Sequence, residues 1–119
     1  MTRAAAVLQL IAAIGVLYSG LFLLDIAPGR PDDSFRFWNG GETALKTGGV
    51  IDIAAGAPLV AHAATAVIKP AEARRRWKVF AALYAAGIAG DLVAGIYGIM
   101  AQIGLYTTLF TAFRARRST

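Results

Sequence analysis

Long apolar runs alternate with short charged segments along the sequence, and the first run predicts a membrane-spanning helix. Residues 4–24 contain no charged side chain and a single amide, that of Gln9. About 20 apolar residues are enough for a helix to cross a hydrocarbon core of about 30 Å. The run is longer than the apolar part of a cleaved signal peptide, which has about 7–15 residues. We therefore predict a retained transmembrane helix at residues 4–26.

A second run predicts another membrane-spanning helix at residues 45–68, after an outer loop at residues 27–44. Asp52, Pro58 and His62 interrupt its apolar character. A proline inside a helix removes one backbone hydrogen bond, so we expect a kink at Pro58. Membrane helices tolerate such kinks where neighbouring groups satisfy the freed backbone.

The third run is too long for one helix. Residues 79–113 contain no lysine or arginine, and a single helix of that length would measure about 52 Å. Two helices, at residues 78–97 and 99–115, fit a bilayer better. We expect the hinge near Tyr97–Gly98, because glycine readily adopts a positive φ angle. Residues 69–77 then form a short loop, and three spans are the alternative.

The basic residues favour four spans over three. The chain has 12 basic residues and a net charge of +5. Four spans place nine of them on one side of the membrane, whereas three spans divide them six to six. Cytoplasmic segments are enriched in lysine and arginine. We therefore predict an all-α polytopic membrane protein, with residues 1–119 forming one domain of four short transmembrane helices. Both termini are expected in the cytoplasm of a cell with a bacterial-type inner membrane.

Composition excludes several classes of protein. The chain is 57% apolar and 16% charged, against about 45–50% and about 25% in soluble domains. It has no cysteine and one histidine, so thiolate and multi-histidine metal sites are excluded and no metal is expected. No nucleotide-binding or zinc-hydrolase motif is present, and the basic loop is too short for a nucleic-acid module. We expect neither catalysis nor a nucleic-acid partner.

Two aspartates in the apolar runs are the strongest candidates for function. The pattern G-x-x-x-D-x-x-x-G occurs at residues 48–56, around Asp52, and again at residues 87–95, around Asp91. A spacing of four places the three residues of each pattern on one helical face. In the four-span topology both aspartates fall in the outer half of the membrane. The sequence therefore predicts that they face each other.

An aspartate inside a membrane costs about 2.5–3.5 kcal/mol on insertion scales, so it usually has a partner or a function. We consider a ligand or proton site formed by Asp52 and Asp91, with Asp25 and Arg36 contributing. A structural role, as caps or protonated hydrogen-bonding groups, is the alternative. The glycines and alanines around them favour close helix packing. The positions expected to pack are Gly48, Gly56, Ala86, Gly87, Gly90, Ala94, Gly95 and Gly98.

Two further features have both a functional and a structural interpretation. The small residues around His62 would leave space for a tetrapyrrole bound axially to the imidazole, but a histidine hydrogen-bonded to another helix is expected, with no cofactor. In the outer loop, the aromatic segment at residues 34–39 suits the membrane interface. A lid or docking surface is the alternative for that segment.

The helix plan resembles that of small four-helix membrane families such as the DoxX-like group. The resemblance rests on Leu17-Tyr18-Ser19-Gly20 and on the face of Asp52 and Gly56, and it transfers no active site. From the sequence we expect a non-catalytic accessory subunit that packs into a larger membrane complex with other chains. The alternatives are a stand-alone carrier or binder of a quinone-like ligand or a proton, and a holin-like pore former.

Overall fold

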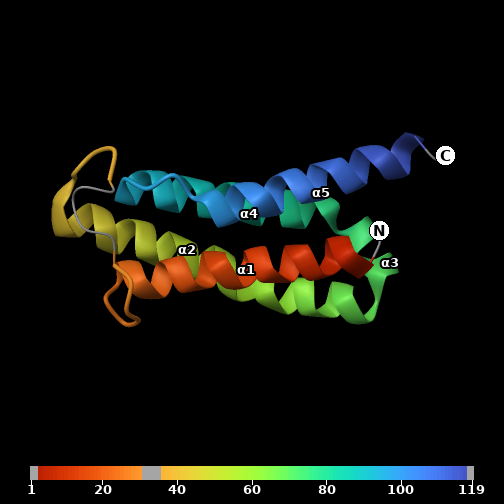
Figure 1. Cartoon of the computed structure of the whole chain (residues 1–119), viewed down its shortest axis with the longest axis horizontal. Helices are drawn as coiled ribbons and strands as arrows, with labels where there is room; N and C mark the ends of the chain where they lie inside the picture. Colours follow the sequence, from red (N-terminus) through yellow and green to blue (C-terminus); the bar gives the residue numbers. More distant parts are fainter. Residues whose placement is uncertain (1–2, 31–35, 118–119) are drawn as a thin grey trace.

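The described part of the chain folds into four long helices and one short helix, and the long helices lie along one axis (Figure 1). The computed structural model describes residues 3–30 and 36–117. The helices are α1 (Arg3–Leu23), α2 (Gly41–Ile68), α3 (Pro70–Arg75), α4 (Trp77–Ala94) and α5 (Ile99–Arg117). The described residues contain no strand. The all-helical bundle predicted from the sequence is confirmed.

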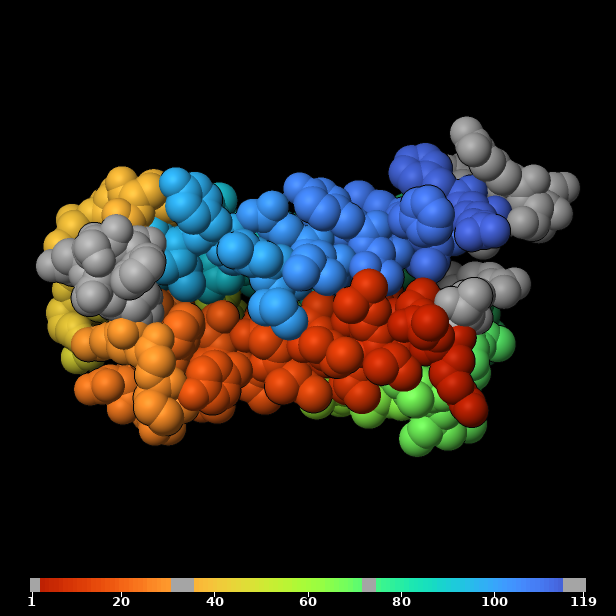
Figure 2. Space-filling view, viewed as in Figure 1, coloured from red at the N-terminus to blue at the C-terminus, as the bar shows by residue number. Residues whose placement is uncertain are grey.

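Consecutive long helices run in opposite directions (Figure 1). The start of α1, the short helix α3 and the end of α5 lie at one end of the bundle, which we call the termini end. The α1–α2 connection and the α4–α5 turn lie at the other end, the loop end. The long helices form a four-membered ring in which α1 and α4 each pack against α2 and α5. Figure 2 shows the side chains of α1 and α5 meeting along one face.

Three of the long helices, α1, α2 and α4, are long and apolar enough to cross a membrane. The fourth, α5, carries Arg114, Arg116 and Arg117 in its last turns, which lower its mean hydropathy. The stretch at 79–113 is divided between α4 and α5, so a single long helix is excluded. These features identify the chain as a helical membrane protein.

The break between α4 and α5 begins earlier than the sequence predicted. Helix α4 ends at Ala94, not at residue 97, because Gly95 adopts a φ angle of 95°. Gly98 has a φ angle of 63° immediately before α5. Both angles lie in the left-handed region that glycine occupies without steric cost. Gly95 and Gly98 therefore shape the turn, which corrects their assignment as helix-packing residues.

Helix α1 also ends before its predicted boundary at residue 26. Asp25 adopts a φ angle of 63°, and its N–H donates to Phe22 O at 3.1 Å. The N–H of Ile26 donates to Leu21 O at 2.9 Å. Together these bonds form a Schellman motif, in which a left-handed residue terminates the helix. Asp25 is exposed and acts as this terminating residue. Contrary to the prediction, it does not lie with the buried aspartates.

Helix α2 starts at Gly41, four residues before the predicted boundary, and continues through Pro58 to Ile68. The loop expected at 69–77 contains the short helix α3, which a turn at Arg76 separates from α4. Pro70 fits the first position of α3, because a backbone N–H at this position would have no acceptor within the helix.

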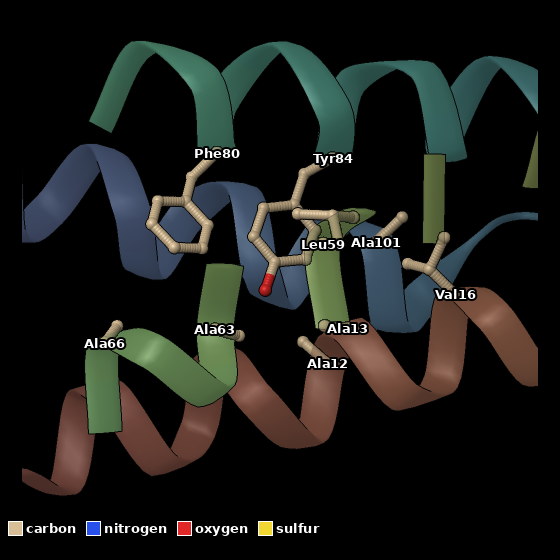
Figure 3. Close-up of a cluster of buried hydrophobic side chains, with 9 residues drawn as sticks. All are labelled: Ala12, Ala13, Val16, Leu59, Ala63, Ala66, Phe80, Tyr84 and Ala101. Atoms are coloured by element: carbon tan, nitrogen blue, oxygen red, sulfur yellow. The ribbon is translucent and has the colours of Figure 1, made fainter. Parts of the chain in front are cut away.

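Small side chains dominate the core between the long helices (Figure 3). Phe80 and Tyr84 of α4 are its largest members and project toward α1 and α2. The other members of this cluster are Ala12, Ala13, Val16, Leu59, Ala63, Ala66 and Ala101. With few bulky groups in the core, the helix backbones approach closely, as is typical of membrane bundles.

Candidate functional site

The structure brings Asp52 of α2 and Asp91 of α4 together inside the bundle. Their side chains are 0% and 2% exposed, and the two carboxyl groups are close enough to interact with each other. Neither aspartate faces the lipid. This is the arrangement expected from the repeated glycine–aspartate pattern.

Two glycines create the space for this acid pair. A Cβ atom added to Gly48 would collide with the carbonyl oxygen of Gly90 and lie 2.9 Å from the Cβ of Ala94. A Cβ atom added to Gly90 would lie 2.5 Å from Asp52 Oδ1. The backbones of α2 and α4 therefore touch at this level, and the Asp52 carboxyl group lies directly against Gly90.

The α4–α5 turn covers the acid pair on the side of the loop end. A Cβ atom added to Gly98 would lie 2.8 Å from Asp91 Oδ2. The N–H of Ile96 donates to the backbone oxygen of Asp91 at 2.9 Å. Asp91 is therefore held between its own helix and the glycine-containing turn.

Three oxygens of the acid pair have no hydrogen-bond donor among the described residues: both of Asp52 and Oδ1 of Asp91. An ionised carboxylate can only accept hydrogen bonds, whereas a protonated one can also donate. Contact between Asp52 and Asp91 therefore becomes a hydrogen bond only when one of them carries a proton. Two adjacent carboxylates away from water cannot both ionise without a large repulsion.

The outer-loop segment at Arg36–Trp38, which we call the loop cap, binds the end of α4. Arg36 Nε donates to Ala94 O at 2.9 Å, and Trp38 Nε1 donates to Leu92 O at 2.8 Å. The N–H of Phe37 donates to Gly95 O at 2.9 Å. The last carbonyl groups of a helix lack partners within it, and an arginine there also complements the helix dipole.

The bonds of Arg36 lie at the end of α4 and within its own loop, and its contribution to the aspartate site stays a prediction. Its side chain donates to Ala94 O at 2.9 Å and to Asn39 Oδ1 at 3.1 Å. Arg30 behaves similarly at the end of α1, where it donates to Leu23 O at 2.8 Å and forms a 2.5 Å ion pair with Glu42. The remainder of the aromatic segment, residues 34–35, lies outside the described residues.

The predicted packing residues contact different neighbours. Gly48, Gly90 and Ala94 lie between α2 and α4, whereas Gly56 lies against the backbone of Leu17 in α1. Gly87 faces α1 and α5, where an added Cβ would lie 3.0 Å from Val16. Ala86 is partly exposed. The small residues mainly allow helices of this chain to pack closely against one another.

His62 has a structural partner. Its Nδ1 lies 3.1 Å from Arg76 Nη1, and its ring meets Phe80 edge-on, with centroids 6.1 Å apart. Because arginine only donates, Nδ1 accepts and the proton of the neutral imidazole resides on Nε2. This contact joins α2 to the turn before α4 at the termini end, as the hydrogen-bonded interpretation expected.

A second buried polar group was missed in the sequence. Gln9 Nε2 donates to Thr108 Oγ1 at 2.8 Å, and Tyr84 Oη donates to Gln9 O at 2.5 Å. All three side chains are 0% exposed, and they come from α1, α5 and α4. The single amide in an otherwise apolar run was the available signal. Its partners could not be predicted, because Gln9 and Thr108 are 99 positions apart.

Comparisons with protein-family models, curated proteins and solved structures give no match. The resemblance to the DoxX-like group therefore has no support beyond the helix plan. The buried polar groups are the features of the molecule that indicate a function.

Proposed function

We propose that this protein is a small membrane carrier that binds a proton between Asp52 and Asp91. The observation that carries this proposal is a pair of buried carboxyl groups with three oxygens that lack donors. Ionisable groups inside membrane bundles commonly mark proton or ion pathways. One proton shared by the pair joins the two carboxyl groups through a hydrogen bond, and its uptake and release change the charge of the core by one unit.

A proton suits the site better than a metal cation does. Calcium takes about 6–8 oxygen ligands, and magnesium takes an octahedral set. The described residues contain no cluster of three or more histidine, cysteine, aspartate or glutamate side chains. Two aspartates alone supply too few ligands for either ion.

The alternative function is that of an accessory subunit, whose small-residue helix faces would pack against other chains. Gly48, Gly56 and Gly90 already contact helices of the same chain, so they are not available to a partner. The apolar side chains on the outside of the bundle, such as Ile11 and Phe110, are accounted for by contact with lipid. The carrier proposal has the more specific structural basis.

We further propose that both termini lie in the cytoplasm and that α5 is the fourth span. Nine of the 12 basic residues belong to segments that gather at the termini end, which the positive-inside rule assigns to the cytoplasm. Reporter fusions at Thr119 and at Gly41 will then report a cytoplasmic C-terminus and an external loop. A C-terminus on the same side as the Gly41 fusion would leave only three spans.

Asp52→Asn and Asp91→Asn will each abolish proton uptake by the purified protein in vesicles. An asparagine keeps the shape and can hydrogen-bond to the remaining carboxyl group, but it cannot bind and release a proton near neutral pH. Uptake is measured with a pH-sensitive dye trapped inside the vesicles, under an imposed potential. Circular dichroism will show that both variants retain the helices.

Asp25→Asn is the matched control, because Asp25 is an exposed carboxyl group at the end of α1. Its uptake will equal that of the unchanged protein. Uptake that persists in both Asp52→Asn and Asp91→Asn would contradict the proposal. So would an unchanged protein whose vesicles take up protons no faster than empty ones.

A further inference from the structure

The acid pair is packed differently on its two sides along the axis of the bundle. Toward the termini end, α4 extends from Asp91 back to Trp77, which is about 21 Å of helix. A Cβ atom added to Gly87, about one turn from Asp91 on this side, would lie 3.0 Å from Val16 and 3.4 Å from Ala101. Packed side chains of the core therefore close this side of the acid pair.

Toward the loop end, the acid pair lies close to the end of its helix. Helix α4 ends at Ala94, three residues after Asp91, which is about 4.5 Å of helix. Beyond it, the backbone of Gly98 in the α4–α5 turn lies against Asp91 Oδ2. The neighbours of Gly98, Tyr97 and Ile99, are 61% and 68% exposed. Because Gly98 has no side chain, the turn covers the carboxyl group with backbone alone at this point.

The loop cap is attached both to the end of α4 and to the turn. The side chains of Arg36 and Trp38 donate to the last carbonyl groups of α4, as described above. Phe37 binds the turn itself, because its N–H donates to Gly95 O at 2.9 Å. Its ring also contacts the ring of Tyr97, with centroids 5.3 Å apart. All three residues of the loop cap therefore hold this end of the bundle together.

We propose that the α4–α5 turn is a gate through which the acid pair exchanges its proton with the loop end, and that the loop cap holds this gate closed. Hinges in proteins are a few residues at the ends of elements that absorb changes in backbone angle. Gly95 and Gly98 lie at the two ends of the turn in the left-handed region, and glycine can leave that region without steric cost. The side of access is inferred from the packing, whereas the movement of a proton through the gate rests on the proposed function.

The exchange requires only water as a co-reactant. Opening of the turn brings water from the loop end to the carboxyl group. The O–H bond of the protonated aspartate breaks, its proton forms a bond to the water oxygen, and the carboxylate keeps the electron pair. The reverse step loads the pair again. The packed core between the acid pair and the termini end does not have to move in either step.

The first test measures which end of the bundle gives access to the acid pair. The chain has no cysteine, so one introduced thiol reports on one position. In Asp91→Cys, the thiol lies beneath the turn. Silver ions, which bind thiols and do not cross lipid, are added to one side of vesicles that contain the protein. Thiols that remain free are alkylated after solubilisation and counted by mass spectrometry. Silver at the loop end is expected to protect the thiol, whereas silver at the termini end is not.

Three further variants calibrate this measurement. Thr43→Cys and Lys69→Cys place an exposed thiol at the loop end and at the termini end, so they report the orientation of the protein in the vesicles. Ala63→Cys places a thiol in the core cluster on the side of the termini end, at a residue that is 0% exposed. Its thiol is expected to remain unprotected from both sides.

The second test loosens the loop cap. Trp38→Phe removes one hydrogen bond to the end of α4. In the Asp91→Cys background it is expected to speed protection by silver about three- to tenfold, as for the loss of one hydrogen bond. Trp77→Phe is the matched control, because it makes the same change at the other end of α4. Its rate is expected to equal that of Asp91→Cys alone.

Protection of the Asp91→Cys thiol from the termini end, or from neither end, would overturn the gate. Equal rates with Trp38→Phe and Trp77→Phe would overturn the role of the loop cap. If circular dichroism shows that Asp91→Cys has lost its helices, Asp52→Cys takes its place with the same expected results. Proton uptake by the unchanged protein tests the carrier separately, so either proposal can fail while the other stands.

Discussion

Replacing Gly48 with leucine will strongly destabilise the bundle. The Cβ position of Gly48 collides with the backbone oxygen of Gly90, and a helix backbone cannot move aside as a flexible side chain can. Overpacking a core costs about 1–3 kcal/mol and occasionally more, and we expect the upper part of that range. Thermal unfolding in micelles, followed by circular dichroism, will measure the loss.

The matched control for this change is Ala54→Leu on the same helix. Ala54 is exposed on the outside of α2, so leucine there adds apolar surface toward the lipid without entering a helix contact. Its unfolding temperature will remain close to that of the unchanged protein. If Gly48→Leu unfolds at the same temperature as Ala54→Leu, α2 and α4 do not touch at Gly90.

The acid pair will show strong energetic coupling in a double-mutant cycle. Asp52→Ala or Asp91→Ala alone leaves the other carboxyl group buried without its partner, and each is expected to cost about 2–3 kcal/mol. The double variant removes both polar groups, so its loss will fall short of the sum of the two single losses by about 1–2 kcal/mol. Chemical denaturation in mild detergent provides the free energies of unfolding.

A pair that includes the exposed Asp25 serves as the reference for additivity. The losses in Asp25→Ala and Asp52→Ala will add, because the two side chains have no contact in the structure. Additive losses for Asp52→Ala and Asp91→Ala would instead show that their carboxyl groups do not interact. That result would remove the basis for a shared proton, independently of any measurement of uptake.

The number and direction of the helices could be predicted, because both depend on long stretches of sequence. The absence of lysine and arginine from residues 79–113 indicated two helices, and the distribution of basic residues indicated that the termini lie together. Helix ends were predicted less well. Asp25 in a left-handed conformation and the early turn at Gly95 depend on single backbone angles, which average hydropathy does not reveal.

The acid pair could be predicted because helical spacing fixes which residues share a face. Asp52 and Asp91 each have glycines four residues away, and topology placed them at similar depth. The role of Arg36 could not be predicted, because its acceptor is a backbone oxygen 58 positions away. Any helix end offers such acceptors, so side-chain chemistry alone does not show which one an arginine binds.

The loop cap has a consequence for the order in which the protein is made. Arg36 and Trp38 precede the carbonyl groups they bind by 58 and 54 positions. In the proposed orientation the loop cap, which precedes α4 in the chain, reaches the membrane before α4 does. About 40 residues separate it from the start of α4, which take about 2–8 s at about 5–20 residues per second. The end of α4 therefore reaches the far side of the membrane when its hydrogen-bond donors are already there, and its last carbonyl groups need no other partner during assembly.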